Sequence, residues 1–83
     1  MPRYYFDLRE GDEIVSDEAG VDLPSLERVQ EEAANSLADF AKDVVRRHRL
    51  TDGAARQLAI DVRDANGLVL QARFTFDIGR VRQ

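Results

Sequence analysis

Apolar and polar residues alternate strictly at the start of the chain. Tyr4, Phe6 and Leu8 fall on one side of an extended segment, and polar residues separate them. Only Tyr5 interrupts the polar set with an aromatic ring. This period of two is typical of a strand that buries one face. A Gly-Asp turn signal follows, and the extended pattern resumes at residues 13–16, so the N-terminus predicts a β-hairpin.

The longest predicted element is a helix that begins at Pro24 and Ser25. Proline suits the first turn of a helix, and serine caps the free amides there. Apolar residues then recur at spacings of three and four, which forms one wide stripe. The stripe consists of Leu26, Val29, Ala33, Leu37, Phe40 and Val44, flanked by Ala34, Ala38, Ala41 and Val45. The basic residues 46–49 suit a helix C-terminus, and the Asp-Gly pair at residues 52–53 provides the stop.

Residues 57–78 predict a second hairpin, and the side-chain pattern selects its register. A two-residue loop at the Asn-Gly pair would place Val62 opposite Gln71 and mix the apolar and polar faces. A three-residue loop over residues 65–67 pairs Val62 with Leu70 instead. The other apolar pairs of this register are Ile60 with Ala72 and Leu58 with Phe74. We therefore predict a three-residue loop that ends in a left-handed glycine and a bulge.

The element order strand, strand, helix, strand, strand predicts an α+β fold. In 83 residues there is room for one small core, so residues 1–83 form a single domain. The simplest arrangement is a four-stranded antiparallel sheet (ββαββ) with the helix on one face, in the spatial order 2-1-3-4. A helix of about 25 residues is longer than such a sheet is wide. An overhanging apolar stripe and a bare sheet edge favour a homodimer.

Composition excludes several kinds of chemistry. The chain has no cysteine and one histidine, which rules out disulfides, a thiol nucleophile and a zinc site. No phosphate-binding glycine loop or catalytic triad is recognisable, so we expect neither an enzyme nor a cofactor. No apolar run reaches the roughly 18 residues that span a bilayer, and no signal-peptide block follows Met1. These patterns predict a cytoplasmic protein that does not contact a membrane.

Charge is distributed unevenly along the chain. Residues 1–41 carry three basic and eleven acidic side chains, and residues 42–83 carry nine and five. The net charge of −4 disfavours general binding of nucleic acid. The basic residues at the end of the helix are the best candidates to bind an acidic group on RNA, a phosphate or a protein. These residues are Arg46, Arg47, His48 and Arg49, and a solvated helix end is the alternative explanation for them.

An acidic stretch lies in the predicted turns between positions 12 and 22. Carboxylate oxygens suit calcium or magnesium, but their spacing does not follow an EF-hand loop, and turns are normally polar. The stretch consists of Asp12, Glu13, Asp17, Glu18 and Asp22. We expect no metal site there.

The N-terminal half carries a resemblance. The chain opens with Met-Pro-Arg-Tyr-Tyr-Phe and continues with Gly-Asp at residues 11–12, Asp-Glu at 17–18, Gly20 and Leu23 before the alanine-rich helix. This pattern resembles a family of small alphaproteobacterial proteins that is filed as a domain of unknown function. Members often have a histidine where this chain has Asp7, so no role of that histidine transfers. The element order is also similar to that of HicB-type antitoxin modules.

Without catalytic residues, an independent domain of this kind is expected to work by recognition. We expect a non-enzymatic protein-interaction module whose partner is another protein, bound at a sheet edge or on the outer face of the sheet. Tyr5, Arg63 and Arg73 are the outer-face candidates, because alternation turns the other sheet aromatics into the core. The alternative is an antitoxin-like or regulatory protein that contacts nucleic acid through the basic helix end.

Overall fold

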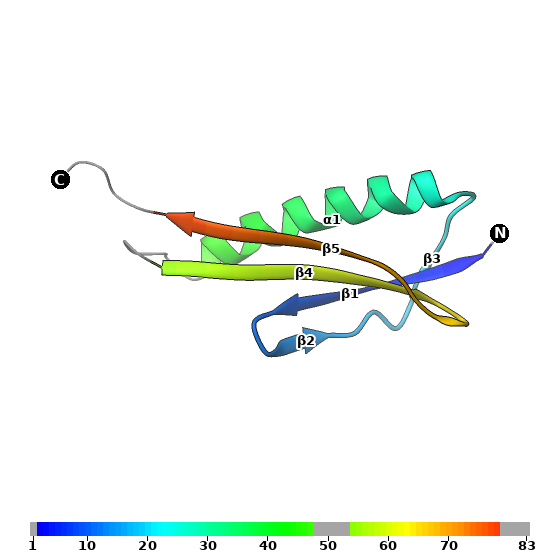
Figure 1. The fold of residues 1–83 in the computed structure, drawn as a ribbon, viewed down its shortest axis with the longest axis horizontal. Helices are drawn as coiled ribbons and strands as arrows, with labels where there is room; N and C mark the ends of the chain where they lie inside the picture. Colours follow the sequence, from blue (N-terminus) through cyan, green and yellow to red (C-terminus); the bar gives the residue numbers. More distant parts are fainter. Residues whose placement is uncertain (1, 48–53, 79–83) are drawn as a thin grey trace.

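The computed structural model describes residues 2–47 and 54–78, which form two layers (Figure 1). One layer is an antiparallel sheet, and a single helix lies across one of its faces. The elements are β1 (Arg3–Glu10), β2 (Glu13–Val15), β3 (Val21–Asp22), α1 (Leu26–Arg47), β4 (Ala54–Asp64) and β5 (Gly67–Ile78). The α+β class, with one helix on an antiparallel sheet, is confirmed. His48, Arg49 and the predicted stop at residues 52–53 lie outside the described residues.

The strand order is β2-β1-β4-β5, which is the predicted order of the two hairpins. The prediction of four strands was one short, because β3 also pairs with β1 through Tyr4 and Val21. Two residues are too few to show an alternating pattern, so β3 leaves no signal in the sequence. The sheet ends in β5, which pairs only with β4 in the part of the chain that the structure describes.

The register of the β4–β5 hairpin is the predicted one. Val62 pairs with Leu70, and the pairs Ile60 with Ala72 and Leu58 with Phe74 follow in step. The predicted loop was wrong in one detail, because the extra residue is not in the loop. It lies in β5 at Val69, where the register shifts between the Val62 and Arg63 pairs.

The turn itself connects Asp64 to Gly67 through two residues. The Asn66 amide donates to Asp64 Oδ1 at 2.8 Å, which closes the chain locally. Gly67 has a φ of 121°, whereas no described non-glycine residue has a positive φ. A type I′ turn requires positive φ at both central residues, so the turn is not of that type. The bulge one pair further along then returns the apolar side chains to the inner face.

The core lies between α1 and the inner faces of β1 and β4. Its buried members are Tyr4, Leu23, Val29, Ala33, Ile60 and Val62. Three residues predicted for the apolar faces are exposed instead: Leu26 at 56%, Leu68 at 68% and Phe74 at 40%. Leu68 precedes the bulge and pairs with Arg63, so it lies on the outer face. Leu26 is the first residue of the helix, and Phe74 is on the edge strand, so each has packing neighbours on one side only.

Ser25 caps the helix as predicted. Its Oγ accepts a hydrogen bond from the Arg28 amide at 3.2 Å, which satisfies one of the free N–H groups of the first turn. Ser25→Ala should lower the free energy of unfolding by about 1 kcal/mol in urea denaturation. Ser25→Asp keeps an acceptor at this position and should stay within about 0.5 kcal/mol of the wild type. Equal losses in the two variants would show that the cap contributes nothing.

Candidate functional site

The outer face of the sheet carries a charge network centred on Arg63. The Nε of Arg63 donates to Asp7 Oδ2 at 2.8 Å, and an Nη of the same side chain donates to the Asp17 carbonyl at 3.0 Å. Its guanidinium carbon lies 4.6 Å from the centroid of the Tyr5 ring, a cation–π contact. The hydrogen bond to Asp7 raises the pKa of Arg63. Arg63 and Tyr5 therefore lie on the predicted face, but both already have partners within the fold.

Asp17 holds the segment between β2 and β3 against β1. Its Oδ2 accepts from the Phe6 amide at 3.1 Å, and its Oδ1 accepts from the amides of Ala19 and Gly20, each at 3.1 Å. The Phe6 amide points away from β4, into the gap between β2 and β3. Asp17 thus supplies the acceptor that a continuous strand would have supplied. Its own amide donates to Asp7 Oδ1 at 2.9 Å, which joins this segment to the Arg63 network.

Gly20 fits the same segment for a steric reason. It has a φ of 73°, and a Cβ built on it would lie 2.8 Å from Cε2 of Tyr5. Glycine alone combines this backbone conformation with the close approach of the ring.

A second charge cluster joins all three long strands. Arg9 of β1 donates from Nη2 to Asp61 Oδ2 on β4 at 3.0 Å, and the Gln71 amide of β5 donates to Asp61 Oδ1. The Gln71 hydrogen bond is the main cause that lowers the pKa of Asp61; burial opposes it and Arg9 reinforces it. For Asp17, partial burial alone would raise the pKa, but the amides of Gly20, Phe6 and Ala19, together with the Arg63 charge, lower it overall.

The lowered pKa values of Asp17 and Asp61 predict how the stability of the fold depends on pH. Their pKa values are lower in the folded chain than the ordinary value of 3.8, so each stabilises the fold fully above that pH. The contribution is lost as pH falls through the folded pKa values. The free energy of unfolding, measured in urea between pH 7 and pH 2, should therefore fall below about pH 4. Asp17→Asn should flatten this fall, whereas Asp39→Asn, at an exposed helix position, should not; identical profiles would contradict the assignment.

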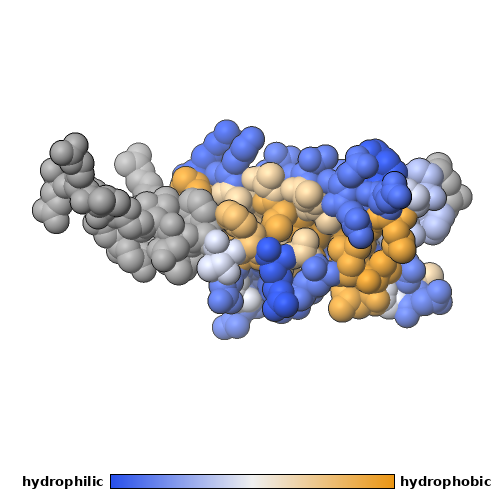
Figure 2. Space-filling model, turned by 45° about the horizontal axis from the view of Figure 1, so that its top comes forward, coloured by the Kyte–Doolittle hydropathy of each residue, from blue (hydrophilic) through white to orange (hydrophobic). Residues whose placement is uncertain are grey.

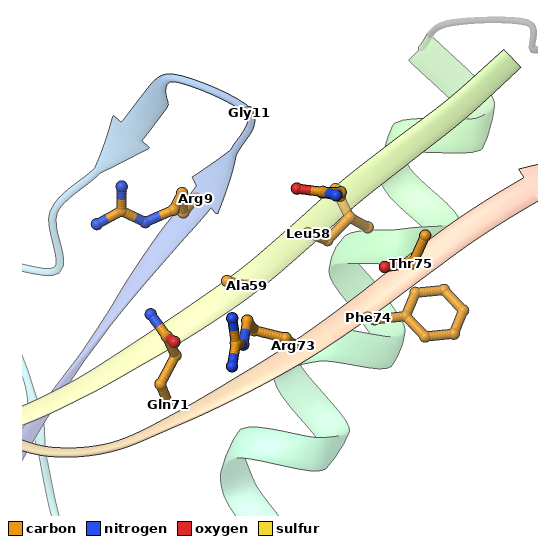
Figure 3. Close-up of a pocket in the computed structure, with 9 residues that line it drawn as sticks. Arg9, Gly11, Leu58, Ala59, Gln71, Arg73, Phe74 and Thr75 are labelled. Atoms are coloured by element: carbon orange, nitrogen blue, oxygen red, sulfur yellow. The ribbon is translucent and has the colours of Figure 1, made fainter.

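Arg73 differs from Arg63, because it forms no ion pair with any residue that the structure describes. It lines an open cavity of about 430 Å³ on the outer face, with Arg9, Gln57, Gln71 and Thr75 among its neighbours. Figure 3 shows the Arg73 side chain and the Phe74 ring on opposite sides of β5. Of the outer-face candidates, Arg73 is the one that remains available to a partner.

The basic helix end is only partly available. Arg47 contacts Asp43 through Nε at 2.9 Å and Glu10 through Nη2 at 3.8 Å. Arg46 is exposed, and it makes no ion pair within the described residues. The structure therefore does not bring Arg46 and Arg47 together as a free pair, and the rest of the predicted cluster lies outside the described residues.

An apolar groove runs between α1 and β5. Figure 2 shows this apolar surface as a band between two polar margins. The groove consists of two adjoining cavities of about 380 and 330 Å³, and Phe74 and Ala41 line both of them. The other lining residues are Ala34, Leu37, Ala38, Lys42, Val45 and Arg46. In the sequence these alanines flank the apolar stripe, but the spacing does not predict that no other element of the described chain covers them.

The free edge of β5 borders this groove. Consecutive residues of an antiparallel strand direct their backbone groups to opposite neighbours. The Gly11 amide donates to the Gln57 carbonyl at 3.3 Å, so Gln57 faces β1 and the next residue, Leu58, faces β5. Leu58 pairs with Phe74, which therefore directs its backbone groups to β4. The intervening residues direct theirs to the free edge: Gln71, Arg73 and Thr75.

The two edges of the sheet differ in how well they are protected. At one edge, β2 has three residues, and Asp17 closes the gap beside it. At the other edge, β5 has 12 residues, and its bulge at Val69 lies near one end. The strand beyond the bulge contains neither proline nor lysine, residues that commonly block such edges. An edge of this length is suited to pairing with a further strand.

A protein-family model matches most of the chain. The model of a domain of unknown function, DUF6894, matches residues 3–77. No curated protein and no solved structure matches the chain. No helix in the described part of the chain is long and apolar enough to cross a bilayer. The expected likeness to a domain of unknown function is confirmed, whereas the alphaproteobacterial origin and the HicB likeness stay predictions.

Proposed function

This chain belongs to the DUF6894 family, a domain of unknown function, and we propose that it is a non-enzymatic protein-interaction module that binds its partner at the free edge of β5. One observation carries the proposal: in the described part of the chain, the β5 edge has no pairing strand and lies directly beside an apolar groove that no other element covers. Strand addition uses both features, because the backbone supplies hydrogen bonds and the groove accepts apolar side chains.

The other candidate surfaces have weaker support. On the outer face, Asp7 and Asp61 already neutralise Arg63 and Arg9. At the helix end, Arg47 contacts two carboxylates. Nucleic-acid binding needs several free cations on one surface, and the chain has a net charge of −4. The β5 edge needs no such cluster.

A proline substitution tests the edge selectively. The Arg73 amide faces the free edge, so Arg73→Pro removes an outward donor without removing a β4–β5 hydrogen bond, and proline is tolerated on edge strands. Arg73→Ala is the matched control, because it removes the side chain and keeps the amide. The tagged wild type and both variants are used to capture proteins from a lysate of the source organism, with and without nuclease.

The expected result is a protein that the wild type and Arg73→Ala retain and that Arg73→Pro loses by at least about tenfold. This protein is either another chain or untagged copies of the domain itself. Retention by Arg73→Pro would overturn the proposal, as would an eluate without any protein that is sensitive to this substitution. Nucleic acid that is lost when Arg46 and Arg47 are changed to Glu would support the alternative function instead.

A further inference from the structure

We propose that the partner at the β5 edge is a second copy of this chain, paired antiparallel to β5 across a two-fold axis at Ala72. This inference rests on the proposed function, and it adds the identity of the partner and the register of pairing. The inference rests on three features of the chain: the β5 edge, the groove and the margin of α1 that borders the groove. When a second copy is rotated by 180°, each of these features complements the same feature of the first copy.

The edge allows only some registers. Hydrogen bonds between the two copies must join the residues whose backbone groups face outward, namely Gln71, Arg73 and Thr75. An axis at Arg73 would place two arginines directly opposite each other, which is unfavourable. An axis at Ala72 pairs Gln71 of each copy with Arg73 of the other, and both pairs are hydrogen-bonded. The residue at the axis is then small.

The same axis also completes the groove. On the inner face it places Leu70 of one copy opposite Phe74 of the other. Leu70 is half-buried and Phe74 is 40% exposed, so both have apolar surface left to cover. The two grooves then adjoin across the paired strands, and the Phe74 rings fill the space between them. Burial of this surface is the main favourable contribution to association.

The margin of α1, the side of the helix that borders the groove, is basic at its C-terminal end and acidic at its N-terminal end. The groove is lined by Lys42 and Arg46 at the C-terminal end of the helix. The helical period places Glu27 and Glu31 on the same margin near the N-terminus, with the groove alanines between the two pairs. All four side chains are exposed, and Glu31 also accepts a hydrogen bond from Arg28 of its own helix at 2.9 Å, an exposed pair that leaves its carboxylate accessible. The midpoint of the acidic and basic pairs lies next to Leu37.

The helix and the strand give the same axis. In Figure 1, α1 and β5 run in the same direction, and Ala41 and Phe74 both line the two groove cavities. Ala72 lies two residues before Phe74 along β5, where each residue advances the strand by about 3.3 Å. In α1 the rise is about 1.5 Å per residue, so the same distance corresponds to about four residues and leads from Ala41 back to Leu37. A two-fold axis at Ala72 therefore places the acidic end of each α1 margin opposite the basic end of the other.

An axis at Phe74 lacks this charge complementarity. It would centre the helices on Ala41, so that Lys42 and Arg46 would face the alanine segment of the second copy. The acidic residues Glu27 and Glu31 would then lie beyond the described end of the opposite helix. Of the axes at Ala72 and Phe74, the Ala72 axis is therefore the one that pairs both the edge and the helix margin.

Cysteine cross-linking tests the register directly, because the chain has no cysteine of its own. Across the axis, Ala72 forms a non-hydrogen-bonded pair with its own copy, with Cα atoms about 4.5 Å apart, a separation that a disulfide can span. Ala72→Cys should form a covalent dimer on mild oxidation. Thr75→Cys is the control, because its two copies lie about 20 Å apart in this register. Cross-linking through Cys at position 75 but not at position 72 would overturn the register.

Charge reversal tests the association without a cysteine. The mass of the wild type, measured by sedimentation at about 100 μM, should be that of a dimer. Glu27→Lys with Glu31→Lys, or Lys42→Glu with Arg46→Glu, should each raise the dimer Kd by at least about tenfold, because like charges then face each other. The fourfold exchange should restore the Kd to within about threefold of the wild type.

The outcomes separate this inference from the proposed function. A strict monomer at about 100 μM would overturn the homodimer, and so would a fourfold exchange that restores nothing. In either case the proposed function still stands if Arg73→Pro releases a different protein from the wild-type eluate. If Arg73→Pro affects neither the mass nor any captured protein, both proposals fall.

Discussion

Ile60→Ala is expected to lower the free energy of unfolding by about 3–4 kcal/mol, the largest effect of the substitutions proposed for this chain. Ile60 is 0% exposed and lies in the middle of β4, with β1 on one side, β5 on the other and α1 above. Every neighbour is part of the regular fold, so the surroundings have little freedom to close the cavity. The cost therefore includes both the lost burial and the cavity itself.

Ile14→Ala is the matched control, because it makes the same chemical change at a side chain that is 52% exposed on β2. It should change the free energy of unfolding by less than about 0.5 kcal/mol. Both values come from urea denaturation at 25 °C, compared at an unchanged slope. Similar losses for Ile60 and Ile14 would contradict the position of the core between α1 and β4.

Asp17→Ala is expected to cost about 2–3 kcal/mol, more than a surface aspartate in a turn normally would. Its carboxylate accepts hydrogen bonds from three backbone amides, of Phe6, Ala19 and Gly20. Alanine leaves the Phe6 amide without its acceptor at a partly buried position. The charge that faces Arg63 is also lost, so the segment between β2 and β3 should detach from the sheet.

The neighbouring Glu18 provides the control for Asp17. Glu18 is exposed, so Glu18→Ala should have an effect of less than about 0.5 kcal/mol in the same urea titration. Amide exchange identifies the site of the damage, because the Phe6 amide should lose protection in Asp17→Ala but keep it in Glu18→Ala. If the Phe6 amide stays protected in Asp17→Ala, its acceptor is not the Asp17 carboxylate.

The features that the sequence predicted are those that a local pattern determines. The β4–β5 register followed from the requirement that Val62, Ile60 and Leu58 meet apolar partners, since a shift by one residue would turn them outward. The helix start followed from Ser25, whose cap depends only on its near neighbours. Strand order followed from the two hairpins and from a right-handed crossover through the helix, which joins them.

The features that the sequence did not predict depend on contacts between distant residues. Asp17 acts on Phe6 across 11 positions, and Arg63 of the adjacent strand β4 reaches Asp7 across 56 positions. In the sequence, Asp17 belonged to an acidic turn, and only the fold shows that backbone amides surround it. The same holds for Arg63, which was a candidate for binding a partner until the structure supplied its internal ones.

The candidate binding surface was predicted only in outline. The apolar stripe and a bare edge suggested self-association, but alternation assigned Phe74 to the core. Its exposure arises because β5 is the last strand of the sheet, which is a property of the topology and not of the neighbouring residues. The groove beside it follows from the same cause.

Amide exchange shows directly whether the free edge of β5 pairs with the same edge of a second copy. The amides of Gln71, Arg73 and Thr75 face the edge, whereas those of Leu70, Ala72 and Phe74 face β4. Exchange is followed by NMR at increasing protein concentration. If β5 pairs with a second copy, the outward amides become protected as concentration rises, while the inward amides are protected throughout. Outward amides that exchange freely at every concentration, beside protected inward amides, would rule out self-association through this edge.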